Sequence, residues 1–154
     1  WSLVERVDLI QRNGQVKSKL SAEFQAGYRS VDLAADEWFV AGHFKLPKKT
    51  IDKTGIRQLL KKRNESQPIG LPSCGSVFKN PPGHYAAQLI EQAGLKGFNF
   101  KSVSVSDKHA NFIISNRESY ARDVEALIVH IQNEVSTKFD IKLEAEVRII
   151  GEYE

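Results

Sequence analysis

One short stretch limits the folds open to this chain more than any other, the run Gly75-Ser76-Val77-Phe78-Lys79-Asn80-Pro81-Pro82. Prolines restrict φ on both sides of it, and Gly75 frees the backbone just before Ser76. Val77 and Phe78 are apolar anchors that we expect to hold a tight turn against a core. Taken alone, such a run is more often a surface loop whose serine caps a neighbouring residue.

The segment that follows, residues 83–97, turns this stiff loop directly into a short apolar helix. We expect this helix to end at a glycine C-cap. A rigid serine-bearing loop joined to a buried helix favours a positioned hydroxyl over a mobile surface loop.

Composition sets the size of the fold and the kind of ligand. With 154 residues and 41% hydrophobic content, the chain can bury one core, or one domain and part of another. A net charge of +3 and a pI near 9.0 suit an anionic ligand. Lysine and arginine form no block interleaved with aromatic residues, so we expect no nucleic-acid partner.

The remaining composition signals exclude further classes. The sequence has no apolar run long enough to span a bilayer and no signal-peptide pattern, so we expect no membrane association. Cys74 is the only cysteine, which excludes an internal disulfide and favours a reducing cytoplasm. The four histidines lack metal-ligand spacing, so we expect no metal site.

The first third of the chain predicts a sheet and a helix. Residues 4–20 form a hairpin in which Asn13-Gly14 favours a type I′ turn. Residues 38–46 predict a strand with one half-buried apolar face, closed by Pro47. Residues 50–64 predict a basic helix that begins near Thr50 or Asp52 and has a short apolar face, Ile56, Leu59 and Leu60.

The rest of the chain predicts three strands and one long helix. The strands are expected at 98–105, at 112–114 and at about 142–150, the last with alternating apolar and charged residues. Ser119 is the expected cap of a helix that ends near Lys138. Strands and helices alternate irregularly, so the pattern favours an α+β fold, with a weak boundary at the polar residues 63–68.

The run 72–81 together with the helix after it resembles the C-terminal half of the UDP-N-acetylenolpyruvoylglucosamine reductases, the MurB family. Residues 142–152 and the segment Val105–Ile113 resemble further signatures of that family. The resemblance implies that residues 1–65 end an FAD-binding lobe and that residues 66–154 form the substrate-binding domain, with a last strand that could pack back on the first part.

The family reduces the enolpyruvyl double bond of UDP-N-acetylglucosamine enolpyruvate to give UDP-N-acetylmuramate, using NADPH through FAD. By resemblance, three residues of this chain are catalytic. Arg29 would bind a carboxylate and stabilise developing negative charge. Ser76 would donate a proton to a strongly basic carbon in a water-poor pocket. Glu146 would donate a hydrogen bond to the developing enolate, for which its pKa must be raised.

The same resemblance suggests residues that hold the substrate. They are Arg63, Lys79, Asn80, Tyr85 and His109. Each has a simpler alternative, since a surface arginine or a packed loop aromatic is common in any fold. An alternating strand face that carries Glu146 is likewise often only solvated.

Two features separate this sequence from a complete member of the family. No glycine-rich turn joins a strand to a helix, so we expect FAD to be bound mainly by a lobe outside this chain, which would leave the chain alone inactive. Lys101-Ser102 also stands where the family carries a glycine pair, and a lysine there would be strained if φ is positive.

These observations leave three functions open. The first is the C-terminal part of a monomeric, cytoplasmic reductase of peptidoglycan precursor synthesis. The second is a non-catalytic module that binds a UDP-sugar or another anion with a degenerate reductase fold. The third is a protein-interaction domain, which only the apolar faces support.

Overall fold

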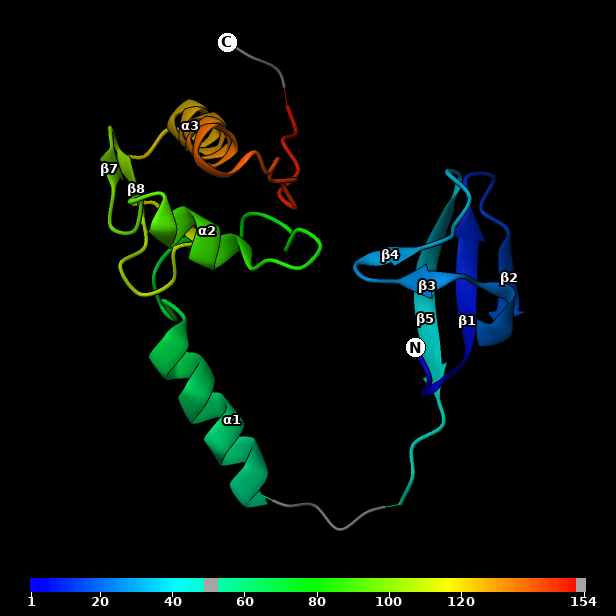
Figure 1. Ribbon diagram of the computed structural model, residues 1–154. Coiled ribbons are helices and arrows are strands. Elements are labelled where there is room, and N and C mark those ends of the chain that lie inside the picture. The colour runs from blue at the N-terminus through cyan, green and yellow to red at the C-terminus, as the bar shows by residue number, and fades with distance from the viewer. Residues whose placement is uncertain (49–52, 152–154) are drawn as a thin grey trace. The chain divides into compact units, whose positions relative to one another are not determined.

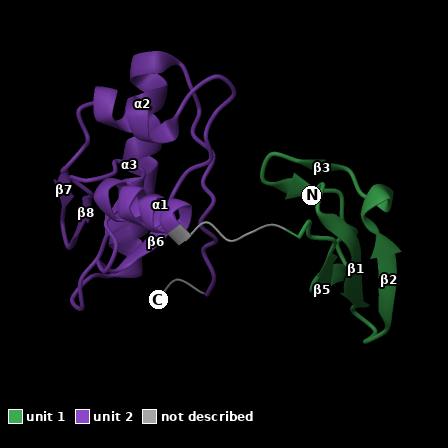
Figure 2. Ribbon diagram, turned by 90° about the horizontal axis from the view of Figure 1, so that it is seen from below, with its two compact units in different colours: residues 1–51 green, residues 52–154 purple. Residues whose placement is uncertain are grey.

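The computed structural model (Figure 1) describes residues 1–48 and 53–151. It divides into two compact units, residues 1–51 and 52–154 (Figure 2). The helix α1 (Lys53–Ser66) therefore belongs with the second unit, although the polar residues 63–68 indicate a boundary after it. The assignment of residues 1–65 and 66–154 to two lobes of a reductase stays a prediction. The expected helix cap at Thr50 or Asp52 lies outside the described residues.

The first unit is an antiparallel sheet with the strand order β2-β1-β5. Its strands are β1 (Val4–Gln11), β2 (Val16–Leu20) and β5 (Glu37–Phe44). A short 3₁₀ turn, Ser21–Glu23, and a two-stranded ladder of β3 (Ala26–Gly27) and β4 (Ser30–Val31) connect β2 to β5. The hairpin predicted over residues 4–20 is confirmed.

The turn of that hairpin is not the predicted type I′ turn. The N–H of Gly14 donates to the carbonyl of Gln11 at 2.8 Å, and the N–H of Gln11 donates to the carbonyl of Gln15 at 2.9 Å. Gly14 has a φ of 83°, whereas Asn13 is not among the described residues with positive φ. A type I′ turn needs positive φ at both central residues, so this loop is a three-residue connection with its glycine in the left-handed region.

The core of the first unit is small, and one face of its sheet is exposed. Val7, Leu9 and Phe24 are the buried apolar residues of its core cluster. Trp38 and Val40 on β5 remain 45% and 54% exposed, so the half-buried face predicted for residues 38–46 is exposed in this chain.

The second unit is a layer of helices on an antiparallel sheet with the strand order β6-β9-β8-β7. The strands are β6 (Ser73–Ser76), β7 (Asn99–Phe100), β8 (Val103–Val105) and β9 (Phe112–Ile114). The helices α2 (Ala86–Gln92) and α3 (Ala121–Phe139) pack together with β8, and their apolar faces form one core with Val77 and Phe78. The α+β class is confirmed, as are the apolar anchors and the strand at 112–114.

The strand predicted over residues 98–105 is wrong, because the chain reverses at Lys101-Ser102. Phe100 pairs with Val103, which makes these two residues the loop of a tight hairpin. Lys101 has a φ of 50°, and it alone of the two turn residues has a positive φ. A positive φ favours glycine, which agrees with the glycine that the family resemblance implies at this position.

Ser119 does not cap α3, contrary to the prediction. Tyr120 occupies the N-cap position and makes no side-chain cap. The Ser119 hydroxyl instead donates to the carbonyl of Ser102 at 2.6 Å, which ties the β7–β8 turn to the start of α3. The predicted end of the helix is confirmed, since Lys138 lies in its last turn.

The strand predicted at about 142–150 is also not formed as a regular ladder. This segment makes one isolated bridge, between Ala145 and Phe78. Leu143 is fully buried and Val147 packs on the core, so the apolar alternation is real, but Ile149 is 60% exposed. In the part of the chain that the structure describes, no helix is long and apolar enough to cross a membrane.

Candidate functional site

Ser76 lies at the end of β6, on the edge of a pocket. It pairs with Phe112 of β9, and Ser73 pairs with Ile114, with an irregular register between the two pairs. Directly opposed residues of antiparallel strands point to the same face of a sheet. Gly75, with a φ of 82°, makes the irregularity feasible, and Ser76 and Phe112 both line the pocket.

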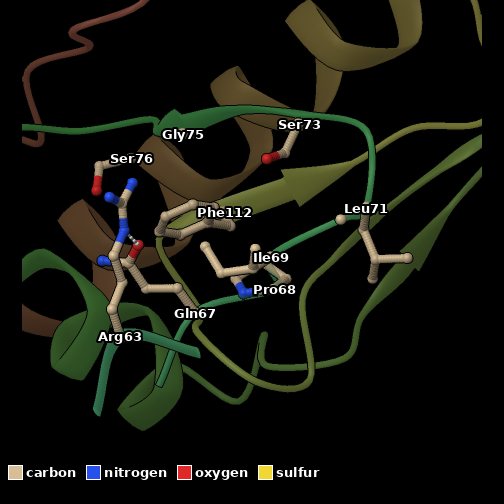
Figure 3. Close-up of a pocket in the computed structure, with 10 residues that line it drawn as sticks. Arg63, Gln67, Pro68, Ile69, Leu71, Ser73, Gly75, Ser76 and Phe112 are labelled. Carbon is tan, nitrogen blue, oxygen red and sulfur yellow. Dashed lines mark hydrogen bonds between the residues drawn. The ribbon is translucent and has the colours of Figure 1, made fainter. Parts of the chain in front are cut away.

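The pocket has a volume of about 410 Å³ and combines apolar and polar groups (Figure 3). Its lining comes from the end of α1, the turn after it, β6 and β9. The residues are Arg63, Gln67, Pro68, Ile69, Gly70, Leu71, Ser73, Gly75, Ser76 and Phe112. Polar atoms contribute more of this lining surface than apolar atoms, so a polar ligand suits the pocket better than an apolar one.

Arg63 is the one cation among these lining residues. Its Nε donates to the Oε1 of Gln67 at 3.2 Å, which holds the guanidinium plane. In Figure 3 the terminal nitrogens extend from α1 toward the end of the pocket where the Ser76 hydroxyl lies. A planar guanidinium beside a hydroxyl can bind a carboxylate or phosphate while the hydroxyl contacts the neighbouring atom.

The backbone after Ser76 is held from two sides. Val77 and Phe78 are 0% and 1% exposed. On one side the N–H of Glu146 donates to the carbonyl of Val77 at 2.8 Å. On the other side Asn111, itself 4% exposed, bonds to the backbone of both residues. The local order of Ser76 therefore comes from burial and main-chain pairing together.

Asn111 was not singled out by sequence reasoning. It falls inside the family signature at 105–113, but a single asparagine in the turn before β9 gives no signal of its partner 33 residues away. A polar residue between apolar Ala110 and Phe112 was the available hint, because a buried amide requires partners.

Glu146 is brought next to Ser76 by its backbone. It lies between Ala145 and Val147, which both pack on the core, and is itself half-buried. Its N–H bonds to Val77, the residue after Ser76. Glu146 is not among the residues that line the Ser76 pocket in the described part of the chain.

Arg29 belongs to the other unit. It lies in the turn between β3 and β4, with a φ of 57°. It lines a second pocket of about 470 Å³, together with Trp1 and Phe39. A non-glycine residue in the left-handed region costs about 1–3 kcal/mol, and such residues concentrate at functional sites. Its role as a carboxylate ligand stays a prediction.

The other predicted substrate contacts have structural partners of their own. Lys79 pairs with the exposed Glu144, and the Oδ1 of Asn80 accepts from the N–H of Ala86 at 3.0 Å, at the start of α2. Tyr85 is 69% exposed. His109 packs edge-on against Phe112 at 4.9 Å, and burial lowers its pKa, so its ring favours the neutral form.

A metal ion and FAD each need a particular set of protein groups. The described residues contain no group of three or more histidine, cysteine, aspartate or glutamate residues that could hold a metal ion. The turns before α2 and α3 carry one glycine, Gly83, and α2 has only seven residues. The residues directly before α1 lie outside the described part of the chain, so the absence of a pyrophosphate cradle for FAD stays a prediction.

The fold and the pocket define an α+β domain in which a serine hydroxyl and a guanidinium line one pocket. Residues 67–150 match the family model described as the UDP-N-acetylenolpyruvoylglucosamine reductase, C-terminal domain. The chain belongs to this family.

Similarity to individual members extends over nearly the whole chain. The UDP-N-acetylenolpyruvoylglucosamine reductase of Alkalilimnicola ehrlichii is 45% identical over 154 residues, which are 99% of this chain and 52% of that protein. That of Coxiella burnetii is 47% identical over 153 residues, 98% of this chain and 48% of the relative. The crystal structure of the Thermus caldophilus enzyme, MurB, has a TM-score of 0.76 and 29% identity over 94% of this chain and 52% of its own. The chain thus spans about half the length of these relatives.

Proposed function

We propose that the protein containing this chain reduces UDP-N-acetylglucosamine enolpyruvate to UDP-N-acetylmuramate, with NADPH as the reductant and FAD as the cofactor. One observation supports this proposal most strongly. In a domain of the reductase family, the Ser76 hydroxyl and the Arg63 guanidinium line the same pocket, at the place where the family resemblance predicts a proton donor.

The substrate's chemistry explains what these residues do. The enolpyruvyl double bond is conjugated with a carboxylate, so hydride adds to its terminal carbon and the electron pair moves to the carbon that bears the carboxylate. The flavin, when bound, supplies that hydride. Ser76 then donates its proton to the carboxylate-bearing carbon, and its alkoxide regains a proton from solvent. A weak acid suffices because the carbon is strongly basic and the hydroxyl is held in place.

The charge that develops on the carboxylate needs positive partners. Arg63 would bind either this carboxylate or the pyrophosphate, and Arg29, by the family resemblance, would stabilise the charge on the enolate oxygens. Glu146 would donate a hydrogen bond to the same oxygens in its protonated form. Lys79, Asn80, Tyr85 and His109 would hold the rest of the UDP-sugar. A monomer in the cytoplasm, with neither nucleic acid nor membrane as a partner, suits this reaction.

The test uses the complete protein that carries this chain. Enolpyruvyl sugar and NADPH are mixed in D₂O, and the product is analysed by mass spectrometry and NMR. We expect one deuterium at the carboxylate-bearing carbon, and deuterium also at the terminal carbon to the extent that the N–H of the reduced flavin exchanges with solvent before hydride transfer. Ser76→Ala should slow single-turnover product formation by ~10²–10⁴-fold, the usual loss of one acid catalyst. Ser136→Ala, an exposed serine on α3, is the matched control.

The non-catalytic alternative predicts a different result from the same samples. A degenerate UDP-sugar-binding module would bind the enolpyruvyl sugar in calorimetry but form no reduced product with NADPH. Binding without product in the parent protein would replace the reductase proposal with that alternative. The absence of both would exclude both.

A further inference from the structure

The Asn111 side chain forms a pair of hydrogen bonds with the backbone of Phe78, a residue shortly after Ser76. Its Nδ2 donates to the carbonyl of Phe78 at 2.8 Å, and its Oδ1 accepts from the N–H of Phe78 at 2.9 Å. This is the pattern that a neighbouring strand would provide, made by a side chain. A neutral amide suits it because it carries both a donor and an acceptor.

The main chain of Asn111 extends this pairing by one residue. Its carbonyl accepts from the N–H of Val77 at 2.9 Å. The remaining polar group of these two residues, the Val77 carbonyl, accepts from Glu146 at 2.8 Å. Asn111 therefore satisfies three of the four backbone groups of Val77 and Phe78, and the segment that carries Glu146 satisfies the fourth.

These bonds cannot be replaced by water without rearrangement. Phe78 is 1% exposed and Asn111 is 4% exposed. Loss of the side-chain amide would leave a buried N–H and a buried carbonyl unpaired, and each such group carries a desolvation penalty. The backbone of Val77 and Phe78 would have to move to find new partners. Ser76 is bonded covalently to Val77, and Glu146 is hydrogen-bonded to the Val77 carbonyl, so both residues would move with it.

We propose that Asn111 is a positioning residue that fixes the Ser76 hydroxyl and Glu146 relative to each other. It touches no reacting atom and acts through the Val77-Phe78 backbone. This inference rests on the proposed reductase function, because it concerns the geometry of the proton donor. It also explains why the 105–113 segment carries a buried amide at this position.

The decisive variant is Asn111→Asp, tested in the complete protein with Asn111→Ala beside it. An ionised aspartate can accept from Phe78 N–H but repels the Phe78 carbonyl. A protonated one restores both bonds, and burial raises the pKa of such a carboxyl. The ratio of variant to parent rates of single-turnover product formation should therefore rise as the pH falls from 8.5 to 5.5. Asn99→Asp, an exposed residue on β7, is the matched control, and its ratio should stay constant.

Asn111→Ala should slow product formation by ~10²-fold, the scale expected for a displacement of about 1 Å at the reacting group. Affinity for the enolpyruvyl sugar, measured by calorimetry, should change far less. In this chain, hydrogen exchange at the Phe78 amide should accelerate in Asn111→Ala. If Asn111→Ala does not fold, the pH-dependent recovery of Asn111→Asp decides alone.

Two outcomes would overturn the inference while the parent still forms product. One is a folded Asn111→Asp protein that works at the parent rate at every pH. The other is a constant deficit with no recovery at low pH. A parent protein that forms no product at all would instead refute the proposed function, so the two failures are distinguishable.

Discussion

The Arg63 side chain is oriented by a hydrogen bond to Gln67, while its terminal nitrogens remain able to bind a ligand. It projects from the last turn of α1, and its Nε bond to Gln67 directs the terminal nitrogens into the Ser76 pocket. The geometry of the planar guanidinium, and not its charge alone, makes this arrangement suitable for an oxyanion.

We therefore expect Arg63→Lys to weaken substrate binding although it keeps the charge. A lysine cannot bond to Gln67 and bind an oxyanion through two parallel donors. Charge-assisted hydrogen bonds contribute about 1.5–3 kcal/mol, and exposure of Arg63 favours the lower end, so affinity should fall by ~10-fold. Calorimetry with the enolpyruvyl sugar measures this change. Arg57→Lys on the same helix is the control, and an unchanged affinity in Arg63→Lys would remove Arg63 from the site.

At the scale of elements, the turn of the β7–β8 hairpin is linked to the start of α3 by hydrogen bonds and an ion pair. The Ser102 hydroxyl donates to Asp123 at 2.7 Å and accepts from the N–H of Tyr120 at 3.3 Å. Lys101 adds an ion pair of 3.5 Å with Asp123. The pair Lys101-Ser102, which departs from the glycines of the family, thus has partners of its own in this fold.

Replacement of the two residues of this turn should change the free energy of unfolding by different amounts. Lys101→Gly relieves the positive φ but adds chain entropy, so its free energy of unfolding should stay within about 1 kcal/mol of the parent. Ser102→Ala leaves the buried Asp123 without its hydroxyl donor and should lower stability clearly. Urea unfolding of the chain measures both. Equal effects would mean that the turn is not fastened through Ser102.

The Ser102 hydrogen bond also makes the hairpin's attachment dependent on pH. This bond, and then Lys101, lower the pKa of Asp123 below its ordinary value of 3.8. A lowered folded-state pKa adds stability above the unfolded value, and this stability is lost as the pH falls through the folded value. Asp123→Asn should therefore be less stable at pH 6 but lose less stability between pH 6 and pH 3. Asp140→Asn controls for the loss of one carboxylate, and a slope equal to the parent's would contradict the assignment.

At the scale of the whole molecule, the two units differ in the number of apolar residues that they bury. The second unit buries sixteen apolar residues in one cluster, whereas the cluster of the first unit contains three. Small domains need a sufficient buried core to fold alone. The apolar side chains exposed on β5 also show that the first unit buries little apolar surface.

We predict that residues 53–151 fold cooperatively when expressed alone and that residues 1–48 do not. Circular dichroism with thermal unfolding, and amide dispersion in NMR spectra, compare the two fragments. A cooperative transition in the isolated fragment 1–48 would show that three buried residues and the Glu37 ion pairs with Lys17 and Lys19 suffice.

We also predict that this chain by itself binds no FAD with useful affinity. Its described residues include no phosphate cradle, and the first unit offers Arg29 and aromatic rings but no helix N-terminus. Purification with added FAD, followed by a visible absorbance spectrum, tests this directly. A yellow protein with a flavin band after gel filtration would contradict it.

The sequence by itself determined the local features, which depend on residues close together along the chain. The buried anchors Val77 and Phe78, the apolar face of α3 and the first hairpin follow from apolar periodicity and turn residues, which act over a few positions. Only the tertiary structure decided the Asn111 pairing with Phe78, 33 residues away, and the Ser102 bond to Asp123, 21 residues away. These contacts depend on which elements meet in space. For the same reason the segment 142–150 became a single bridge instead of a strand, since alternation specifies a face but not a partner.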